Sequence, residues 1–232
     1  MKKISVIIPT IQSKIKVLNK LLMILKDDSA VDEIVLINNS QEKFVPVKKI
    51  KKLKIFNQKK NLFVNPSWNL GIELIKNDYF LIINDDILCP YNFCSIVMSS
   101  DIFDKDDTGL VGLCQSYINN FDRTTFDDID IPVFDESKPI EFESFDYYMG
   151  TGEWASAFFG NKKNYYQIPD EIKIIYGDNY LLKRNLDAGK KNYSMKNLVC
   201  NHIASSSSLR DDLGCDINDS EFAEEYFRED NV

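Results

Sequence analysis

Short apolar runs that end in polar residues restrict the fold of this chain more than any other feature. These runs are Ile4 to Ile8, closed by Pro9-Thr10; Glu33 to Ile37, closed by Asn38-Asn39-Ser40; Leu53 to Phe56; and Tyr79 to Ile83, closed by Asn84-Asp85-Asp86. A continuous apolar run is typical of a strand that is buried on both faces of a parallel sheet. Open sheets of this kind bind ligands beyond the carboxyl ends of their strands, so the sequence predicts an α/β fold with its site there.

Further helices and strands are expected along the rest of the chain. Helices are expected over Ile15 to Leu25, Pro66 to Lys76, Asn92 to Phe103 and Asn179 to Ala188, and strands over Leu110 to Tyr117, Ala155 to Phe159 and Leu198 to His202. The stretch from Asn119 to Tyr148 is acidic and aromatic without a sustained period. We interpret it as a long functional loop or an edge-strand region.

Size, charge and cysteines narrow the class of protein. With 232 residues, of which 44% are hydrophobic, the chain can bury the core of one large α/β domain. Its 28 Lys and Arg against 36 Asp and Glu argue against a nucleic-acid binder, which needs basic surface. Five cysteines without CxxC spacing favour reduced thiols in the cytoplasm. The first apolar run stops at Pro9, so no transmembrane segment is expected there.

The pair Asp85-Asp86 is the first candidate for chemistry. Two adjacent carboxylates at the end of a buried strand suggest a divalent metal, and a metal suggests an anionic ligand. An ordinary turn at the strand end is the alternative interpretation of such a pair.

Several segments, taken in order, resemble glycosyltransferase family 2, whose members have the GT-A fold and invert the configuration at the sugar. Ser5 to Thr10 is similar to the first strand of the family, and Ile34 to Ser40 is similar to its second strand. The resemblance implies that Pro9, Thr10 and Asn38 contact the nucleotide. Ile37 stands where the family has an acidic residue.

The next two matching segments concern the donor and the metal. Asn61 and Asn69 are spaced as in the family, although Phe63 replaces its first glycine, and Lys60 is a candidate for steering the diphosphate. Asn84-Asp85-Asp86 resembles the DxD motif of the family. This implies that Asn84 meets the ribose, that Asp85 positions the sugar and that Asp86 holds the metal.

The last matching segments lie near the end of the chain. Gly177 to Arg184 resembles the catalytic segment of the family, with Asp178 in the place of the general base and Gly177 in the place of another acid. Taken alone, Asp178 is also a good helix N-cap. His202 falls where many members have a late histidine near the metal, although a buried structural imidazole is an alternative.

The resemblance implies a GT-A fold: a Rossmann-like, mostly parallel sheet flanked by helices, with a smaller acceptor-side subregion. We expect one catalytic domain over residues 1–208, in which residues 1–90 bind the nucleotide sugar and residues 91–208 bind the acceptor and carry the base. Residues 209–232 would form an acidic tail or helix, with Phe222, Tyr226 and Phe227 able to dock on the domain.

The implied activity is a metal-dependent, inverting transfer of a hexose or deoxyhexose from a UDP-, GDP- or dTDP-linked donor to a saccharide or glycoconjugate. Mn²⁺ or Mg²⁺ would be held by Asp86 and His202, and Asp178 would take the proton of the acceptor hydroxyl. Gly152, Glu153 and Trp154 are the candidate acceptor site, with a place for Trp154 in the core as the alternative. A partner protein or a second copy of the chain would be a further source of acceptor contacts.

Two other functions remain open. A sugar nucleotidyltransferase has a related sheet, but the segment Thr10 to Lys14 lacks the glycine-rich loop that such enzymes usually carry after the first strand. A non-catalytic module that binds a sugar or nucleotide is the second alternative, and the departures at Ile37, Phe63 and Gly177 are compatible with it.

Overall fold

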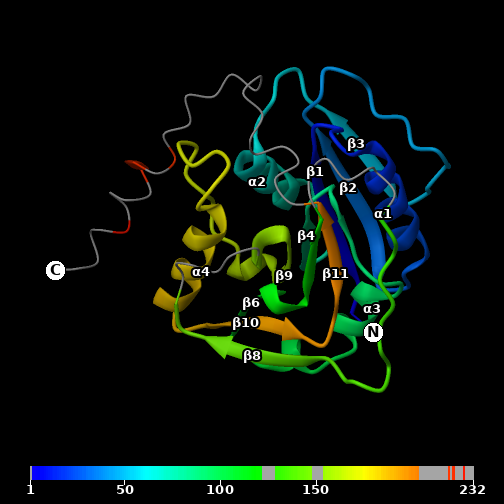
Figure 1. The fold of residues 1–232 in the computed structure, drawn as a ribbon. Coiled ribbons are helices and arrows are strands. Elements are labelled where there is room, and N and C mark those ends of the chain that lie inside the picture. The colour runs from blue at the N-terminus through cyan, green and yellow to red at the C-terminus, as the bar shows by residue number, and fades with distance from the viewer. Residues whose placement is uncertain are drawn as a thin grey trace.

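The computed structural model has two sheets with helices packed around them (Figure 1). It describes residues 2–121, 129–147 and 154–203, together with residues 219, 221, 222 and 227. An eight-stranded sheet forms the centre, and a three-stranded sheet lies beside it. The predicted mixed α/β class with a mostly parallel central sheet is confirmed.

The strands of the central sheet lie in the order β3-β2-β1-β4-β9-β6-β10-β8. Their bounds are β1 Ile4–Thr10, β2 Val31–Asn38, β3 Leu53–Asn57, β4 Tyr79–Ile83, β6 Thr108–Leu113, β8 Glu141–Phe145, β9 Ala157–Asn161 and β10 Lys191–Lys196. The four strands from β3 to β4 are parallel to one another, and β10 is parallel to β6. Strand β9 is antiparallel to both neighbours and joins the two parallel groups, and β8 is antiparallel to β10.

The small sheet has the order β5-β11-β7. It comprises β5 Ile87–Leu88, β7 Ile118–Phe121 and β11 Cys200–Ile203. Strand β5 follows β4 after a short turn, so the small sheet begins where the central strand β4 ends. This connection brings the last described strand, β11, to the polar end of β4.

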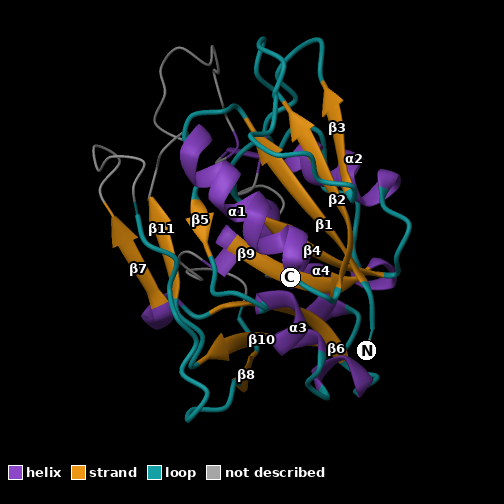
Figure 2. Cartoon of the chain, turned by 90° about the vertical axis from the view of Figure 1, so that its right-hand side faces the viewer, coloured by secondary structure: helices purple, strands orange, loops and turns teal. Residues whose placement is uncertain are grey.

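Helices cover both faces of the central sheet. They are α1 Ile15–Asp27, α2 Val64–Leu74, α3 Phe93–Met98 and α4 Gly177–Asp187, with short 3-10 turns at Ile102–Asp104, Gln115–Tyr117, Trp154–Ser156 and Lys162–Asn164. Figure 2 shows α1 and α3 on the near face of the sheet and α2 and α4 behind it.

Alternate side chains of the central strands enter two separate cores. In β1, Val6 and Ile8 pack with α1 and α3, whereas Ile7 packs with α2 and α4. Both faces of β1 are therefore buried, and for this reason its sequence is a continuous apolar run. Ile37 is fully buried in the second core, so the residue in the place of the family's acid serves packing in this chain.

The structure differs from the sequence-based expectation at two strands. Strands β5 and β10 were not predicted, because β5 has two residues and β10 reads Lys-Asn-Tyr-Ser-Met-Lys, with only two apolar side chains. Asn192 of β10 is nevertheless fully buried. Its side chain accepts a hydrogen bond from the Leu110 amide at 3.2 Å and donates one to the Leu182 carbonyl at 3.0 Å. Long-range partners therefore create a strand that its local sequence does not indicate.

The stretch that was interpreted as a long loop or an edge-strand region contains β7 and β8 among its described residues. Both strands lie at the edge of their sheets, as the second interpretation predicted. In the described part of the chain, no helix has the length and apolar character that a membrane span needs.

Close packing at Gly112 of β6 gives a test of the second core. A Cβ atom at Gly112 would lie 2.1 Å from Cε2 of Trp154, a side chain that is only 2% exposed. Gly112→Ala is therefore expected to lower the free energy of unfolding by about 1–3 kcal/mol, as overpacking of a core does. The measurement is urea denaturation of the purified chain.

The smaller ring in Trp154→Phe should relieve that clash. The penalty of Gly112→Ala is expected to be smaller by about 0.5–3 kcal/mol in the Trp154→Phe background, as a double-mutant cycle would show. Strictly additive changes in the free energy of unfolding would mean that the side chain at position 112 does not clash with Trp154.

Candidate functional site

Polar groups from neighbouring strands meet at the carboxyl ends of β1 and β4. The two strands are parallel neighbours, so Thr10 at the end of β1 lies beside the turn that follows β4. The Thr10 hydroxyl donates a short hydrogen bond to Oδ2 of Asp85, and both side chains are buried. The Asn84 amide donates to the Ser156 carbonyl at 2.9 Å, which fixes the start of the turn. Thr10, Asn84 and Asp85 are thus brought together as the resemblance implied.

Strand β11 brings a histidine to the same turn. In the antiparallel pair of β11 with β5, His202 lies opposite Ile87, and the Ile203 amide donates to the Asp86 carbonyl at 3.0 Å. Nε2 of His202 lies 3.4 Å from Oδ1 of Asp86, and both side chains are buried. The two residues proposed from the sequence as metal ligands are therefore neighbours, although they are far apart in the chain.

The acidic turn has an unusual electrostatic environment. Burial, followed by repulsion from Asp86, raises the pKa of Asp85 to about 7, while the hydrogen bond from Thr10 and the proximity of His202 act in the opposite direction. Two buried carboxylates cannot both ionise easily without a nearby positive charge. A divalent cation supplies that charge, so the turn is chemically suited to one.

The described residues alone offer an incomplete metal site. Among them, no group of three or more His, Cys, Asp and Glu side chains has the arrangement of a metal centre. Asp86 and His202 can supply one carboxylate and one imidazole, which suit Mn²⁺ or Mg²⁺ when phosphate oxygens and water complete the coordination. The geometry fits a cation that binds together with a phosphorylated ligand better than one that binds alone.

Asn38 does not present a free amide for a nucleobase. Its Nδ2 donates to the Glu42 carbonyl at 2.7 Å and to Oδ1 of Asn57 at 2.8 Å. Its Oδ1 accepts from the Gln12 side chain at 3.2 Å and from the Ser40 amide at 3.1 Å. With both donors and the acceptor used, Asn38 joins β2 to the surrounding loops, and direct base recognition would break these bonds.

The two spaced asparagines also shape the protein around them. Oδ1 of Asn61 accepts from the Phe63 amide at 2.8 Å and so closes a tight turn before α2, while Lys60 beside it is exposed. Asn69 is buried, donates to the Ile168 carbonyl at 2.8 Å, and accepts from the Tyr165 hydroxyl at 2.8 Å. Asn69 therefore fixes the segment after β9.

Phe63 has a backbone conformation that normally belongs to glycine. Its φ is 68° and its ψ is −175°, a region in which a residue with a Cβ is strained. The place where the family has glycine thus keeps the glycine-like conformation. The Phe63 side chain makes a cation–π contact, since Nζ of Lys173 lies 5.7 Å from the centroid of its ring.

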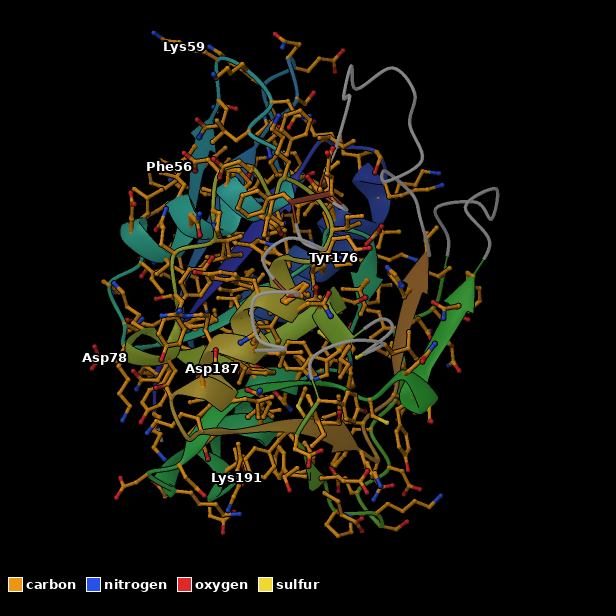
Figure 3. All side chains as sticks on the ribbon, turned by 90° about the vertical axis from the view of Figure 1, so that its left-hand side faces the viewer. Phe56, Lys59, Asp78, Tyr176, Asp187 and Lys191 are labelled. Carbon is orange, nitrogen blue, oxygen red and sulfur yellow. The ribbon has the colours of Figure 1, made fainter. Side chains whose placement is uncertain are left out.

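Asp178 lies in the first turn of α4, but it is not the helix N-cap. The N-cap is Tyr176, whose φ is 65°, and the helix begins at Gly177. The N-cap interpretation of Asp178 is therefore wrong, and its half-buried carboxylate lies at the positive end of the helix dipole. In Figure 3, the labels place Tyr176 higher than Asp187, so α4 begins toward the end of the molecule that carries Phe56 and Lys59.

The glycine before Asp178 has a steric reason. A Cβ at Gly177 would lie 2.2 Å from Oδ1 of Asn65, a fully buried side chain in the first turn of α2. The Asn65 amide group donates to the Ile172 carbonyl at 3.1 Å and to the Ile175 carbonyl at 3.4 Å. An acidic side chain at position 177 would collide with this contact, which explains the departure from the family pattern.

The expected acceptor residues have different outcomes. Gly152 and Glu153 lie outside the described residues, so their role stays a prediction. Trp154 is buried, its Nε1 donates to the Tyr193 carbonyl at 3.2 Å, and its ring stacks on Phe158 with centroids 5.3 Å apart. The alternative interpretation holds for Trp154: its ring is part of the core and offers no open face to a sugar.

Asn120 is a site residue that the sequence did not indicate. It lies opposite His202 in the parallel pair of β7 with β11, and its Oδ1 is 3.2 Å from Nδ1 of His202. An amide oxygen only accepts hydrogen bonds, so this contact favours a proton on Nδ1 and directs Nε2 toward Asp86. No motif in the strand sequence points to this role, because it arises from the register of β7 against β11.

The tautomer of the imidazole can be measured directly, since His202 is the only histidine of the chain. In ¹⁵N NMR spectra of the metal-free protein, at a pH where the ring is neutral, we expect a population with the proton on Nδ1, in competition with the Nε2 tautomer that the Asp86 carboxylate favours. Asn120→Ala should increase the fraction with the proton on Nε2, whereas Asn119→Ala on the same strand should not. An unchanged tautomer ratio in Asn120→Ala would contradict the proposed contact.

Comparison with known proteins identifies the family and the fold. Residues 5–188 match the family model described as glycosyl transferase family 2. No curated protein matches the chain.

Solved structures of GT-A glycosyltransferases share the fold at low sequence identity. Residues 1–349 of TarS from S. aureus give a TM-score of 0.57 and 13% identity, covering 87% of this chain and 60% of that one. GalNAc-T7, crystallised with UDP, GalNAc and Mn²⁺, gives a TM-score of 0.62 and 13% identity, covering 87% of this chain and 43% of that one. The chain thus spans less than two thirds of these structures, and the predicted GT-A fold is confirmed. Because the family model matches residues 5–188 of 232, the chain belongs to glycosyltransferase family 2.

Proposed function

We propose that this protein is a metal-dependent, inverting glycosyltransferase that moves a hexose or deoxyhexose from a nucleotide sugar to a saccharide or glycoconjugate. The observation that carries the proposal is the buried pair of Asp86 and His202 beside the Thr10–Asp85 hydrogen bond. A carboxylate from the turn after β4 and an imidazole from β11 converge where open α/β sheets bind ligands. Family membership supports the reaction class.

Mn²⁺ or Mg²⁺ would be held by Asp86 and His202. When bound, the metal would neutralise charge that develops on the diphosphate as it leaves. Asp85 would stay oriented by Thr10 and contact the sugar or the water around the metal. The GalNAc-T7 structure contains both UDP and Mn²⁺, which supports this pairing of metal and nucleotide by analogy.

Asp178 would act as the general base. The acceptor oxygen would form its bond to the anomeric carbon while the bond from that carbon to the phosphate oxygen breaks, and the hydroxyl proton would pass to Asp178. The nucleoside diphosphate would leave on the opposite face, and a single displacement of this kind inverts the anomeric centre. The place of Asp178 at the start of α4, half-buried and accessible in part, supports the role.

The remaining donor contacts are proposed from position and exposure. Pro9 and Thr10 end β1 and Asn84 directly follows β4, so they lie at the carboxyl edge where a nucleotide would bind. Lys60 and Asn61 lie between β3 and α2, with the ammonium group of Lys60 in solvent. Asn38 and Asn69 would act indirectly, by holding the loops that contact the nucleotide.

Loss of a metal ligand should abolish metal-dependent nucleotide binding. Thermal-shift measurements across UDP-, GDP- and dTDP-sugars with Mn²⁺ should find one donor that stabilises the protein by about 2.7 kcal/mol at a concentration of about 100 Kd. For a chain of this size, that corresponds to roughly 5–10 °C. EDTA and Asp86→Asn should each remove most of this shift.

Asp85→Asn is the matched control for Asp86→Asn. An asparagine at position 85 can still accept the hydrogen bond from Thr10, and it makes the same acid-to-amide change in the same turn. We expect it to keep a larger part of the Mn²⁺-dependent shift than Asp86→Asn. An equal loss in both variants would contradict the assignment of Asp86 as the ligand.

Substitution of the base should remove transfer and leave the fold intact. Asp178→Asn is expected to lower kcat about 10²–10⁴-fold, the usual contribution of a general base, without weakening donor binding. Asp187→Asn, at the other end of α4, changes an exposed carboxylate that pairs with the buried Lys183 and should have nearly normal kcat. Near wild-type transfer by Asp178→Asn would exclude Asp178 as the base.

The same assays separate the proposed function from its alternatives. A nucleotidyltransferase would make a nucleotide sugar from a sugar phosphate and a nucleoside triphosphate, so product analysis distinguishes it. A non-catalytic binding module would show the thermal shift with a donor but neither transfer nor hydrolysis of that donor.

A further inference from the structure

One acidic residue outside the family match is buried against the segment that precedes the proposed base. Asp219 is 0% exposed, whereas the match to the family model ends at residue 188. Its Oδ1 accepts from the Lys173 amide at 2.9 Å, and its Oδ2 accepts from the Ile174 amide at 2.6 Å and the Ile175 amide at 2.9 Å. Three successive backbone N–H groups converging on one carboxylate form a strong, charge-assisted anchor.

The anchored residues lead directly to Asp178. We call residues 172–175 the pre-helix segment; it is followed by Tyr176, by Gly177 and then by Asp178. The φ of 65° at Tyr176 turns the chain sharply into α4. A displacement of the pre-helix segment would therefore move the first turn of the helix, including the carboxylate of Asp178.

The pre-helix segment is held from two sides. Asn65 of α2 binds its carbonyl groups at Ile172 and Ile175, and the Asn65 backbone amide donates to the Lys173 carbonyl at 2.9 Å. Asp219 binds its N–H groups from the other direction. Carbonyl and amide groups of the same four residues are thus paired with different parts of the chain, and Asp219 comes from beyond β11, the last strand among the described residues.

An apolar contact reinforces the anchor. Phe222, three residues after Asp219, packs against the core cluster that contains Tyr180 and Leu181 of α4. Docking of Phe222 on the domain agrees with the expectation from the sequence, whereas Tyr226 lies outside the described residues. Asp219 and Phe222 therefore contact the pre-helix segment and the core beneath α4, respectively.

We propose that Asp219 is a positioning residue for Asp178. Asp219 sets the position of the base by fixing the three N–H groups that precede α4. This inference rests on the proposed function, in which Asp178 takes the acceptor proton. The groups proposed to hold the metal belong to the turn after β4 and to β11, whereas the hydrogen bonds of Asp219 go to residues 173–175, so the loss of Asp219 should leave metal-dependent donor binding nearly unchanged.

The test compares full-length variants of Asp219. Asp219→Ala removes every acceptor, and Asp219→Asn keeps one oxygen, so kcat is expected to fall in the order wild type, Asp219→Asn, Asp219→Ala. A misplacement of about 1 Å can cost on the order of 10²-fold in rate, and we expect a loss of about 10–100-fold for Asp219→Ala. The KM for the donor should change by less than about twofold. Glu221→Gln removes one charge from the neighbouring, exposed position and should keep wild-type kcat.

A double-mutant cycle distinguishes positioning from stability. If Asp219 acts through Asp178, then Asp219→Ala should cause little further loss of kcat in the Asp178→Asn background. All rates are measured well below the unfolding temperature of each variant, which is determined separately. A variant that melts at a lower temperature but keeps wild-type kcat would overturn the proposal, and so would additive losses in the cycle.

The outcomes also separate this inference from the proposed function. If Asp178→Asn keeps transfer, the base assignment fails, and with it the premise of the proposal. If Asp178→Asn is inactive while Asp219→Ala keeps wild-type kcat, the base assignment stands and only the positioning role is excluded.

Discussion

The parallel pairing of β1 with β4 is the constraint on which the site depends. In this register Ile4 lies opposite Tyr79 and Ile7 opposite Ile82, so both strands end at the same edge of the sheet. Because both faces are buried, a slip of one residue would exchange the apolar sets of the two cores, and the register is therefore strongly fixed. The hydrogen bond from Thr10 to Asp85 follows from this register. A buried acid at this position is tolerated because the strand ends deliver a donor to it.

The sequence predicts the first half of the fold well because most strands there are apolar and are buried on both faces. Strands such as β4, predicted and found at Tyr79–Ile83, consist of apolar residues that are buried on both faces, so local composition and final environment agree. Strand β10 shows where this agreement ends. Its buried Asn192 is satisfied by the backbone of α4, ten residues before it, and by the backbone of β6, which lies 82 residues away in the sequence. Such a strand is stabilised by tertiary hydrogen bonds, which no window of residues reveals.

The sequence predicts where in the fold the candidate site residues lie, but it predicts only some of the contacts that these residues make. Motif order placed Asp85, Asp86 and His202 correctly at one edge, since strand ends and their acids are local features. Asn38 illustrates the limit, because whether an amide is free to bind a ligand depends on the neighbours that the fold supplies. Asn120 shows the converse, in which an ordinary strand residue gains a role from the register of two strands.

Departures from the family pattern have local steric explanations and do not require loss of activity. Gly177 is small because Asn65 occupies the space of a Cβ, and Asn65 in turn binds the segment before α4. Phe63 keeps a glycine-like φ of 68°, a strained conformation, at a position where its ring contacts Lys173 of that same segment. Both departures therefore lie around residues 172–175, the segment that Asp219 binds from the other side. Since strain persists only where surrounding contacts over-determine it, the concentration of such features here indicates that the position of α4 is tightly specified.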